Sequence, residues 1–145
     1  MAVDRMKAIS LLQPWASLVM MGLKHWETRS WPTKHKGDIA IHASKGMCEA
    51  GCDLMVRDET LRMFAAKGMF PSFNELPRGV VLGVCSLHQC VRSDSLTAAE
   101  VGSDAAYGDF SSGRWCWFLM VKEKFKEPVP ARGMQGLWNW ERPGV

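Results

Sequence analysis

Two long apolar segments constrain the fold of this chain more than any other feature of its sequence. They are GVVLGVCSLHQCVR, residues 79–92, and WCWFLMVKEKF, residues 115–125. Both are rich in the β-branched and aromatic residues that strands favour, so we predict a long strand at each. Gly83 interrupts the first of them, which indicates a bulge or a point where another backbone comes close. The core is therefore expected to rest on strands.

Shorter segments complete the predicted set of strands and helices. Strands are expected at residues 8–12, between the turn at Gly22 and Pro32, at 37–44 and at 137–140. Helices are expected at 14–21, where proline opens and glycine follows the segment, at 48–67, and in a short turn at 96–101. About five to six strands are thus interleaved with two to three helices.

The connections between these elements are irregular, and the sequence contains no internal repeat. We therefore predict an α+β fold built on a small β-barrel or curled sheet, and not a doubly wound parallel sheet. The 145 residues are 47% hydrophobic and 23% charged, which is typical of one globular domain spanning 1–145.

Several functional classes find no support in the sequence. No run of about 18 apolar residues predicts a membrane span, and MAVDRMKAIS lacks the apolar stretch of a signal peptide, so we expect a cytoplasmic protein without membrane partners. The five cysteines have neither a disulfide framework nor zinc-finger spacing with the histidines. We expect reduced thiols, no metal and no cofactor.

Charge is distributed unevenly along the chain although its net value is only +3. Residues 24–45 hold five lysines and arginines against two acids, whereas residues 93–109 form an acidic segment. The basic region is compatible with an anionic ligand near the first third of the chain.

The stretch GLKHWETRSW, residues 22–31, combines charged side chains with two indoles. A solvated strand would carry the charged side chains but not the indoles. A core strand would carry the indoles but not the charged side chains. Along a strand, Glu27 and Arg29 share one face with Trp31, while Trp26 and Thr28 lie on the other. The mixture predicts a half-buried place where polar groups serve a ligand.

The sequence lacks the glycine-rich dinucleotide-binding, P-loop, zincin and serine-hydrolase motifs. It does contain the pattern GxKxxExR, which follows QPWASLVMMG and is formed by Gly22, Lys24, Glu27 and Arg29. This pattern resembles the ASCH domain family, whose fold is similar to that of the RNA-binding PUA domains. RSWPTKHKGDIAIHASK, LPRGVVLGVCSLHQCV and RWCWFLMVKEKFKEPVPARGMQGLW resemble the family's further strands in order. The resemblance covers nearly the whole chain.

The resemblance implies a cleft lined by the GxKxxExR segment that receives RNA or a nucleotide. A lysine or arginine there can bind phosphate, an indole can stack on a base for about 1–3 kcal/mol, and Glu27 can accept from an exocyclic amine. The residues expected at the cleft are Trp15, Lys24, Trp26, Glu27, Arg29, Trp31, His42, Ser44, Lys45, Arg114 and Trp115.

Some ASCH-like proteins are amidohydrolases acting on N4-acetylcytidine, with a threonine nucleophile three residues after the motif lysine, and others are ribonucleases. That position is Glu27 here, and the adjacent Thr28 points to the opposite strand face, so the threonine mechanism does not transfer. A metal-independent hydrolase would use Glu27 to activate water, with Lys24 as a fixed cation because the carboxylate opposes loss of its proton.

Three functional readings therefore remain open. The first is a module that binds RNA or a modified nucleotide, and the second is a hydrolase of RNA or nucleoside derivatives at the same cleft. The third is a protein-interaction module in transcription regulation, using an apolar patch around Met69, Phe70 and Phe73. The sequence leaves the exact ligand, the oligomeric state and the biological pathway undetermined.

Overall fold

The computed structural model describes residues 4–69 and 71–144. They form a six-stranded mixed sheet in the order β2-β5-β4-β3-β1-β6. The strands are β1 (Asp4–Gln13), β2 (Trp26–Arg29), β3 (Gly37–Met47), β4 (Val80–Arg92), β5 (Trp115–Pro130) and β6 (Leu137–Arg142). All neighbouring strands are antiparallel except β1 and β3. The predicted α+β class and strand number are confirmed.

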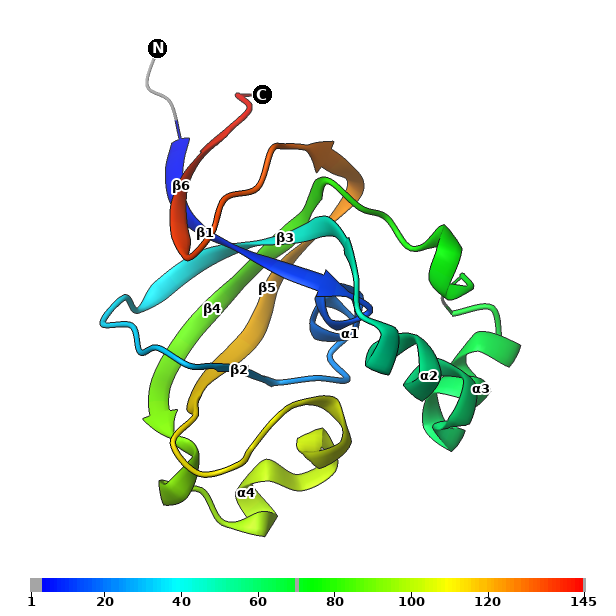
Figure 1. Cartoon of the computed structure of the whole chain (residues 1–145). Helices are drawn as coiled ribbons and strands as arrows, with labels where there is room; N and C mark the ends of the chain where they lie inside the picture. Colours follow the sequence, from blue (N-terminus) through cyan, green and yellow to red (C-terminus); the bar gives the residue numbers. More distant parts are fainter. Residues whose placement is uncertain (1–3, 70, 145) are drawn as a thin grey trace.

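The sheet curls around a common interior without closing into a complete barrel (Figure 1). Within residues 4–69 and 71–144, no strand pairing joins the outer strands β2 and β6. β1 and β6 run side by side, with Asp4 opposite Arg142, which places the two ends of the described chain together (Figure 1). The expected β-barrel is thus an open, curled sheet.

Four α-helices surround the sheet, more than the two to three expected. They are α1 (Trp15–Met20), α2 (Glu49–Arg57), α3 (Glu59–Ala66) and α4 (Ala98–Val101). Short 3-10 helices cover Phe73–Glu75, Ser93–Ser95 and Gly102–Tyr107. Figure 1 places α2 and α3 together on one flank, and α4 beside β2 at another end of the molecule.

The prediction of one helix over 48–67 was wrong, because Asp58 divides it. Asp58 has extended backbone geometry (φ −71°, ψ 123°), and its carboxylate accepts from the Leu61 N–H at the start of α3. An aspartate in this role satisfies a backbone donor that an isolated helix start would leave free. The local cap therefore overrides the continuous apolar pattern.

The last long strand extends further than predicted, since β5 runs to Pro130 and not to Phe125. Val129 and Pro130 pair with Val81 and Val80 on β4. Proline is tolerated at such a place because the strand is an edge there and needs no donor on its free side.

The main core lies inside the curl of the sheet. Ile9, Ile41, Leu87, Trp117 and Leu119 are each at most 2% exposed and come from four different strands. Gly83 is the predicted point of close approach: a Cβ there would lie 2.3 Å from the Glu123 carbonyl and 2.5 Å from the Met20 side chain. Because glycine has no Cβ atom, α1 can pack on the sheet at this position.

Candidate functional site

A large hollow lies where β1, β3 and β5 end and β4 begins. It has a volume of about 1290 Å³, ample for a nucleotide. We call it the cationic pocket. It is lined by Ser10, Leu12, Arg29, Trp31, His42, Ser44, Lys45, Gly79 and residues 130–136.

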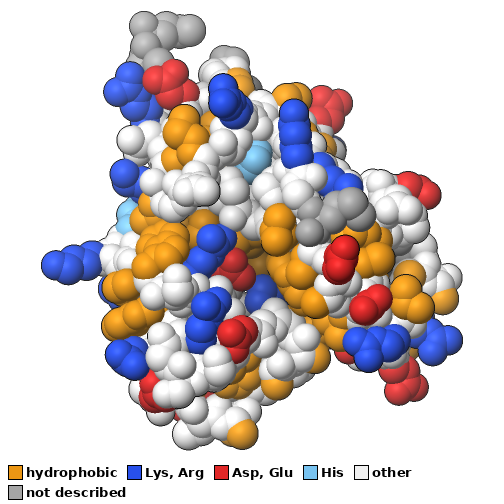
Figure 2. Space-filling model, in the orientation of Figure 1, with side chains coloured by type: hydrophobic (Ala, Val, Ile, Leu, Met, Phe, Trp, Pro, Cys, Tyr) orange, Lys and Arg blue, Asp and Glu red, His pale blue; other side chains and the backbone are white. Residues whose placement is uncertain are grey.

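The charge of this pocket has one sign. Its lining contributes the cations Arg29, Lys45 and Arg132 and contains no aspartate or glutamate. Figure 2 shows Lys and Arg side chains around the centre and upper part of the drawn face, beside exposed apolar side chains. Walls of one charge concentrate the field in a concave site and attract anions.

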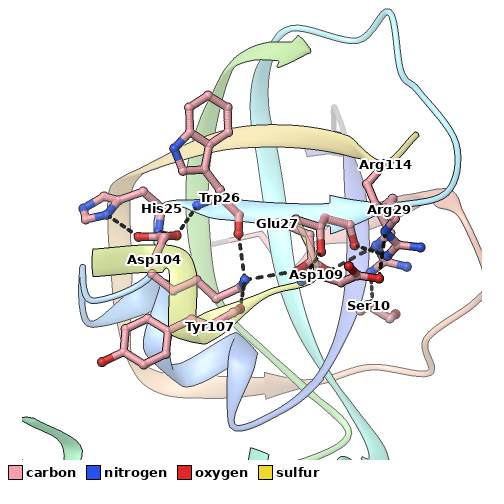
Figure 3. A network of polar contacts seen from close by, with 11 residues as sticks. Ser10, His25, Trp26, Glu27, Arg29, Asp104, Tyr107, Asp109 and Arg114 are labelled. Atoms are coloured by element: carbon pink, nitrogen blue, oxygen red, sulfur yellow. Dashed lines mark hydrogen bonds and ion pairs between the residues drawn. The ribbon is translucent and has the colours of Figure 1, made fainter. Parts of the chain in front are cut away.

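Arg29 is held in the pocket by two neighbours. Its Nε donates to Glu27 Oε2 at 3.1 Å, and its Nη2 donates to the Ser10 carbonyl at 2.7 Å (Figure 3). The side chain remains 23% exposed, and its guanidinium lies 6.0 Å from the ring centre of Trp31. A guanidinium has five N–H donors, so those not used here are available to a ligand.

Lys24 lies beneath this arrangement and does not line the cationic pocket. It is 2% exposed, donates to the Trp26 carbonyl at 2.7 Å and to the Tyr107 carbonyl, and lies 3.8 Å from Glu27 Oε1. The expectation that Lys24, Glu27 and Arg29 converge on an open cleft was therefore wrong for Lys24. Two of its N–H groups donate to carbonyls inside the protein, and the Glu27 carboxylate lies at ion-pair distance.

Burial also acts on the acid–base behaviour of Lys24. Desolvation lowers the pKa of its ammonium below the usual value, while the carboxylates of Glu27 and Asp104 oppose that shift. Desolvation outweighs the carboxylates, so the net shift of the Lys24 pKa is downward. Both oxygens of Glu27 are occupied, one by Lys24 and one by Arg29, so Glu27 serves to couple the two cations.

The acidic segment 93–109 fixes the start of β2 from the outside. Asp104 is 1% exposed and accepts from the backbone N–H groups of His25 and Trp26 at 2.8 and 2.7 Å, and its other oxygen lies 3.1 Å from His25 Nδ1 (Figure 3). Tyr107 supplies the carbonyl that receives Lys24. The acidic residues therefore anchor the GxKxxExR segment, a role that their separation in sequence did not suggest.

His42 and Ser10 form a hydrogen-bonded pair in the wall of the pocket. His42 Nε2 lies 2.8 Å from the Ala131 carbonyl, which can only accept, so Nε2 carries a proton. Desolvation lowers the pKa of His42, which favours the neutral ring with Nδ1 as an acceptor for the Ser10 hydroxyl at 2.9 Å. Trp138 Nε1 donates to the same hydroxyl at 3.1 Å.

The structure separates the residues that the sequence assigned to one cleft. Arg29, Trp31, His42, Ser44 and Lys45 line the cationic pocket. The six that do not are Trp15, Lys24, Trp26, Glu27, Arg114 and Trp115.

Most of these six are engaged elsewhere in the fold. Trp26 is buried against Phe118, and the Trp15 ring lies 5.4 Å from Lys24 Nζ. Arg114 donates to the Thr28 carbonyl at 3.1 Å, and Trp115 lies under the Arg92 guanidinium. Their aromatic and basic character serves packing and strand pairing here.

Sequence reasoning missed the segment 130–136, which closes one side of the pocket and carries Arg132. Gly133 comes so close to the Ser10–His42 pair that an added Cβ would lie 2.5 Å from His42 Cε1 and 2.6 Å from Ser10 Oγ. The sequence signal for this segment is the spacing of two glycines and an arginine in PARGMQG.

The apolar patch expected around Met69, Phe70 and Phe73 does not form as predicted. Met69 is 54% exposed, but Phe73 is only 7% exposed and lies under the Arg78 guanidinium. Phe70 lies outside the described residues.

Neither a group of metal ligands nor a membrane-spanning helix is found among the described residues. Across 4–69 and 71–144, no three His, Cys, Asp or Glu side chains are grouped as metal ligands would be, and the five cysteines are free thiols. No helix in that part of the chain has the length and apolar character needed to cross a membrane.

Comparison with known proteins gives a consistent family. The ASCH domain model matches residues 9–129. Activating signal cointegrator 1 of Mus musculus is 37% identical over 135 residues, and that of Homo sapiens is 38% identical over 137. Each match covers 90% of this chain but only 22% of the relative, so the chain spans about a fifth of these proteins.

A solved structure has a similar fold. The crystal structure of ASCH from Zymomonas mobilis aligns with a TM-score of 0.51 at 17% identity, over 86% of this chain and 72% of that one. At this identity the likeness concerns the fold alone.

Proposed function

The chain belongs to the ASCH domain family, and on this premise we propose that it binds RNA or a nucleotide in the cationic pocket. The observation that carries the proposal is the composition of that pocket. Three cations and an indole line it, and no carboxylate does. Such a lining suits a ligand that combines phosphate with an aromatic base.

Different residues of the cationic pocket contact different parts of the ligand in this proposal. Arg29, fixed by Glu27 and the Ser10 carbonyl, presents its remaining N–H groups to a phosphate. Lys45 and Arg132 are exposed and add charge at the rim. Trp31 packs edge-on against Trp117, with ring centres 4.9 Å apart, which holds its indole in place for a base to stack.

Lys24 and Glu27 act on the ligand indirectly under this proposal. Lys24 holds Glu27, and Glu27 holds Arg29. The charged residues of the GxKxxExR motif thus contact one another in sequence from Lys24 to Arg29, and Arg29 is the one that contacts the ligand.

The test is RNA binding as a function of salt. Fluorescence anisotropy with a short fluorescein-labelled RNA of mixed sequence should show affinity that falls as salt rises, because phosphate contacts release counterions. Arg132→Gln should weaken binding and reduce the salt slope by about one. Arg62→Gln is the matched control, since Arg62 is exposed on α3 and lines no pocket. Equal behaviour of the two variants would contradict the proposal.

A hydrolase at the same pocket is the second candidate, and the Ser10–His42 pair favours it. A hydroxyl bonded to a neutral imidazole, whose other nitrogen is fixed by a carbonyl, has the arrangement of an activated nucleophile. Glu27 does not line the pocket, and its two oxygens lie 3.8 Å from Lys24 Nζ and 3.1 Å from Arg29 Nε, so it is not placed to activate a water there. Mass spectrometry after incubation with N4-acetylcytidine or RNA should therefore show product that Ser10→Ala abolishes; without product, the pocket binds only.

A further inference from the structure

A second, smaller hollow lies away from the cationic pocket, between α1, residues 69 and 71–77, and β5. Its volume is about 230 Å³, and we call it the apolar pocket. It is lined by Ser17, Met20, Met21, Met69, Pro71, Leu76, Pro77, Leu82, Lys124, Phe125, Lys126 and Pro128. Flexible methionines and rigid prolines dominate this lining, a combination that adapts to an apolar side chain.

The charge at the rim of the apolar pocket has a single sign. Lys124 and Lys126 are exposed, and no acid lines the pocket. Phe125, between them, packs against Trp140 and the Arg142 guanidinium. Lys124, Phe125 and Lys126 all line the pocket, and the two exposed lysines lie at its rim.

The neighbouring edge of β5 lacks a strand partner over most of its length. β2 pairs with Trp115–Phe118, and Leu119 donates to the His25 carbonyl at 2.8 Å. Beyond Leu119, no strand in 4–69 or 71–144 pairs with that side of β5. Met120 and Val121 are 48% and 42% exposed, as expected for an open edge.

The backbone of β5 also bulges beside the pocket. Lys124 pairs with Gly83 and Val129 with Val81, so the four intervening residues of β5 have no regular partners on β4. Bulges, lysines and prolines are features that protect an exposed edge against indiscriminate pairing, which is consistent with a free edge here.

From these observations we propose that β5 and the apolar pocket dock an extended, acidic peptide segment of a protein partner. The segment lies along the free edge, where its backbone pairs with β5. One bulky aliphatic side chain enters the pocket, and flanking Asp or Glu residues meet Lys124 and Lys126.

A nucleic acid fits this surface less well than a peptide. Among residues 4–69 and 71–144, Phe125 is the aromatic residue that lines the pocket, and its ring packs against Trp140. No other aromatic ring of these residues lines the pocket for a base to stack upon.

The experiment is selection from a displayed library of random dodecapeptides against the whole chain, followed by affinity measurements on synthetic copies. Selected peptides should combine acidic residues with one Leu, Ile or Met. Reversal of both lysines, Lys124→Glu with Lys126→Glu, should weaken binding by about tenfold. Met69→Asp, at the exposed rim, should do the same. Lys34→Glu is the control, because Lys34 is exposed in the β2–β3 connection and lines neither pocket.

Hydrogen exchange distinguishes strand pairing from contact with the pocket alone. Bound peptide should slow exchange of backbone amides in residues 120–127 by about tenfold or more. The proposal is overturned if no acidic peptide is selected, if the lysine reversals leave affinity unchanged, or if those amides stay unprotected. Weakening of RNA binding by the same reversals, with peptide binding intact, would instead assign this surface to nucleic acid.

Discussion

Replacement of Lys24 by methionine tests whether the motif lysine is structural. Methionine fills a similar volume but donates no hydrogen bond, so the Trp26 and Tyr107 carbonyls lose their partner in a site that is 2% exposed. A buried carbonyl left unpaired costs about 1–3 kcal/mol, and two cost about 2–6 kcal/mol. Removal of the desolvated ammonium offsets part of this loss.

The expected net loss is about 2–4 kcal/mol of unfolding free energy, a large share of the 5–15 kcal/mol that is typical for a domain. Urea denaturation followed by tryptophan fluorescence measures it. Lys34→Met, at an exposed site, should stay within about 0.5 kcal/mol of the wild type.

The difference in unfolding free energy between the wild type and Lys24→Met should also depend on pH, and the direction of that dependence is a second test. The pKa of Lys24 is lowered from its ordinary value of 10.5, so the unfolded chain binds this proton more tightly than the folded chain. The stability of the wild type relative to Lys24→Met should therefore rise as pH increases from the lowered pKa toward 10.5. An Lys24→Met variant as stable as the wild type, or a falling difference with pH, would refute the structural role.

Three further predictions concern the pocket and the core. Trp31→Leu should weaken RNA binding by about 1–3 kcal/mol, measured by anisotropy, since a stacking surface is lost; unchanged affinity would remove Trp31 from the site. Gly133→Ala should lower the melting temperature and weaken binding, because its methyl group collides with His42, at a cost of about 1–3 kcal/mol; a variant that is neutral in both assays would contradict the close approach. Burial raises the pKa of the Cys85 thiol to about 12, so Cys85 should resist iodoacetamide in the folded protein while the partly exposed Cys48 reacts. Peptide mass spectrometry measures the labelling of each, and equal labelling would place Cys85 outside the core.

The sequence allowed the strands to be predicted because their signals are local. Alternation in GDIAIHAS and the apolar runs at 79–92 and 115–125 correspond to β3, β4 and β5. The split at Asp58 was missed although its signal is equally local, since an aspartate before a turn of helix is a common cap. The apolar spacing across 48–67 was given too much weight.

The position of Lys24 could not be predicted for a different reason. Its partner Tyr107 is 83 residues away, and Asp104 reaches Trp26 across 78 residues. Nothing in the strand pattern states that the acidic segment folds onto β2, so a lysine among charged neighbours was assumed to face solvent. Strand alternation did place Glu27 and Arg29 on a common face, and these two are hydrogen-bonded.

Arg132 was missed because its surroundings were treated as a connection without structure. The segment 130–136 is close to Ser10 and His42 only after β5 and β6 have taken their places in the sheet. Glycine spacing alone does not state which elements such a segment will approach.

The central claim is that an RNA or nucleotide ligand enters the cationic pocket beside Arg29 and leaves Lys24 enclosed. The most direct measurement is a titration of the ¹⁵N-labelled protein with a short RNA, followed by ¹H–¹⁵N correlation spectra. RNA in the pocket should shift the Trp31 indole N–H and the Gly79 and Gly133 amides and leave the Gly102 amide unmoved. Shifts confined to residues outside the pocket, or none at a saturating RNA concentration, would contradict it.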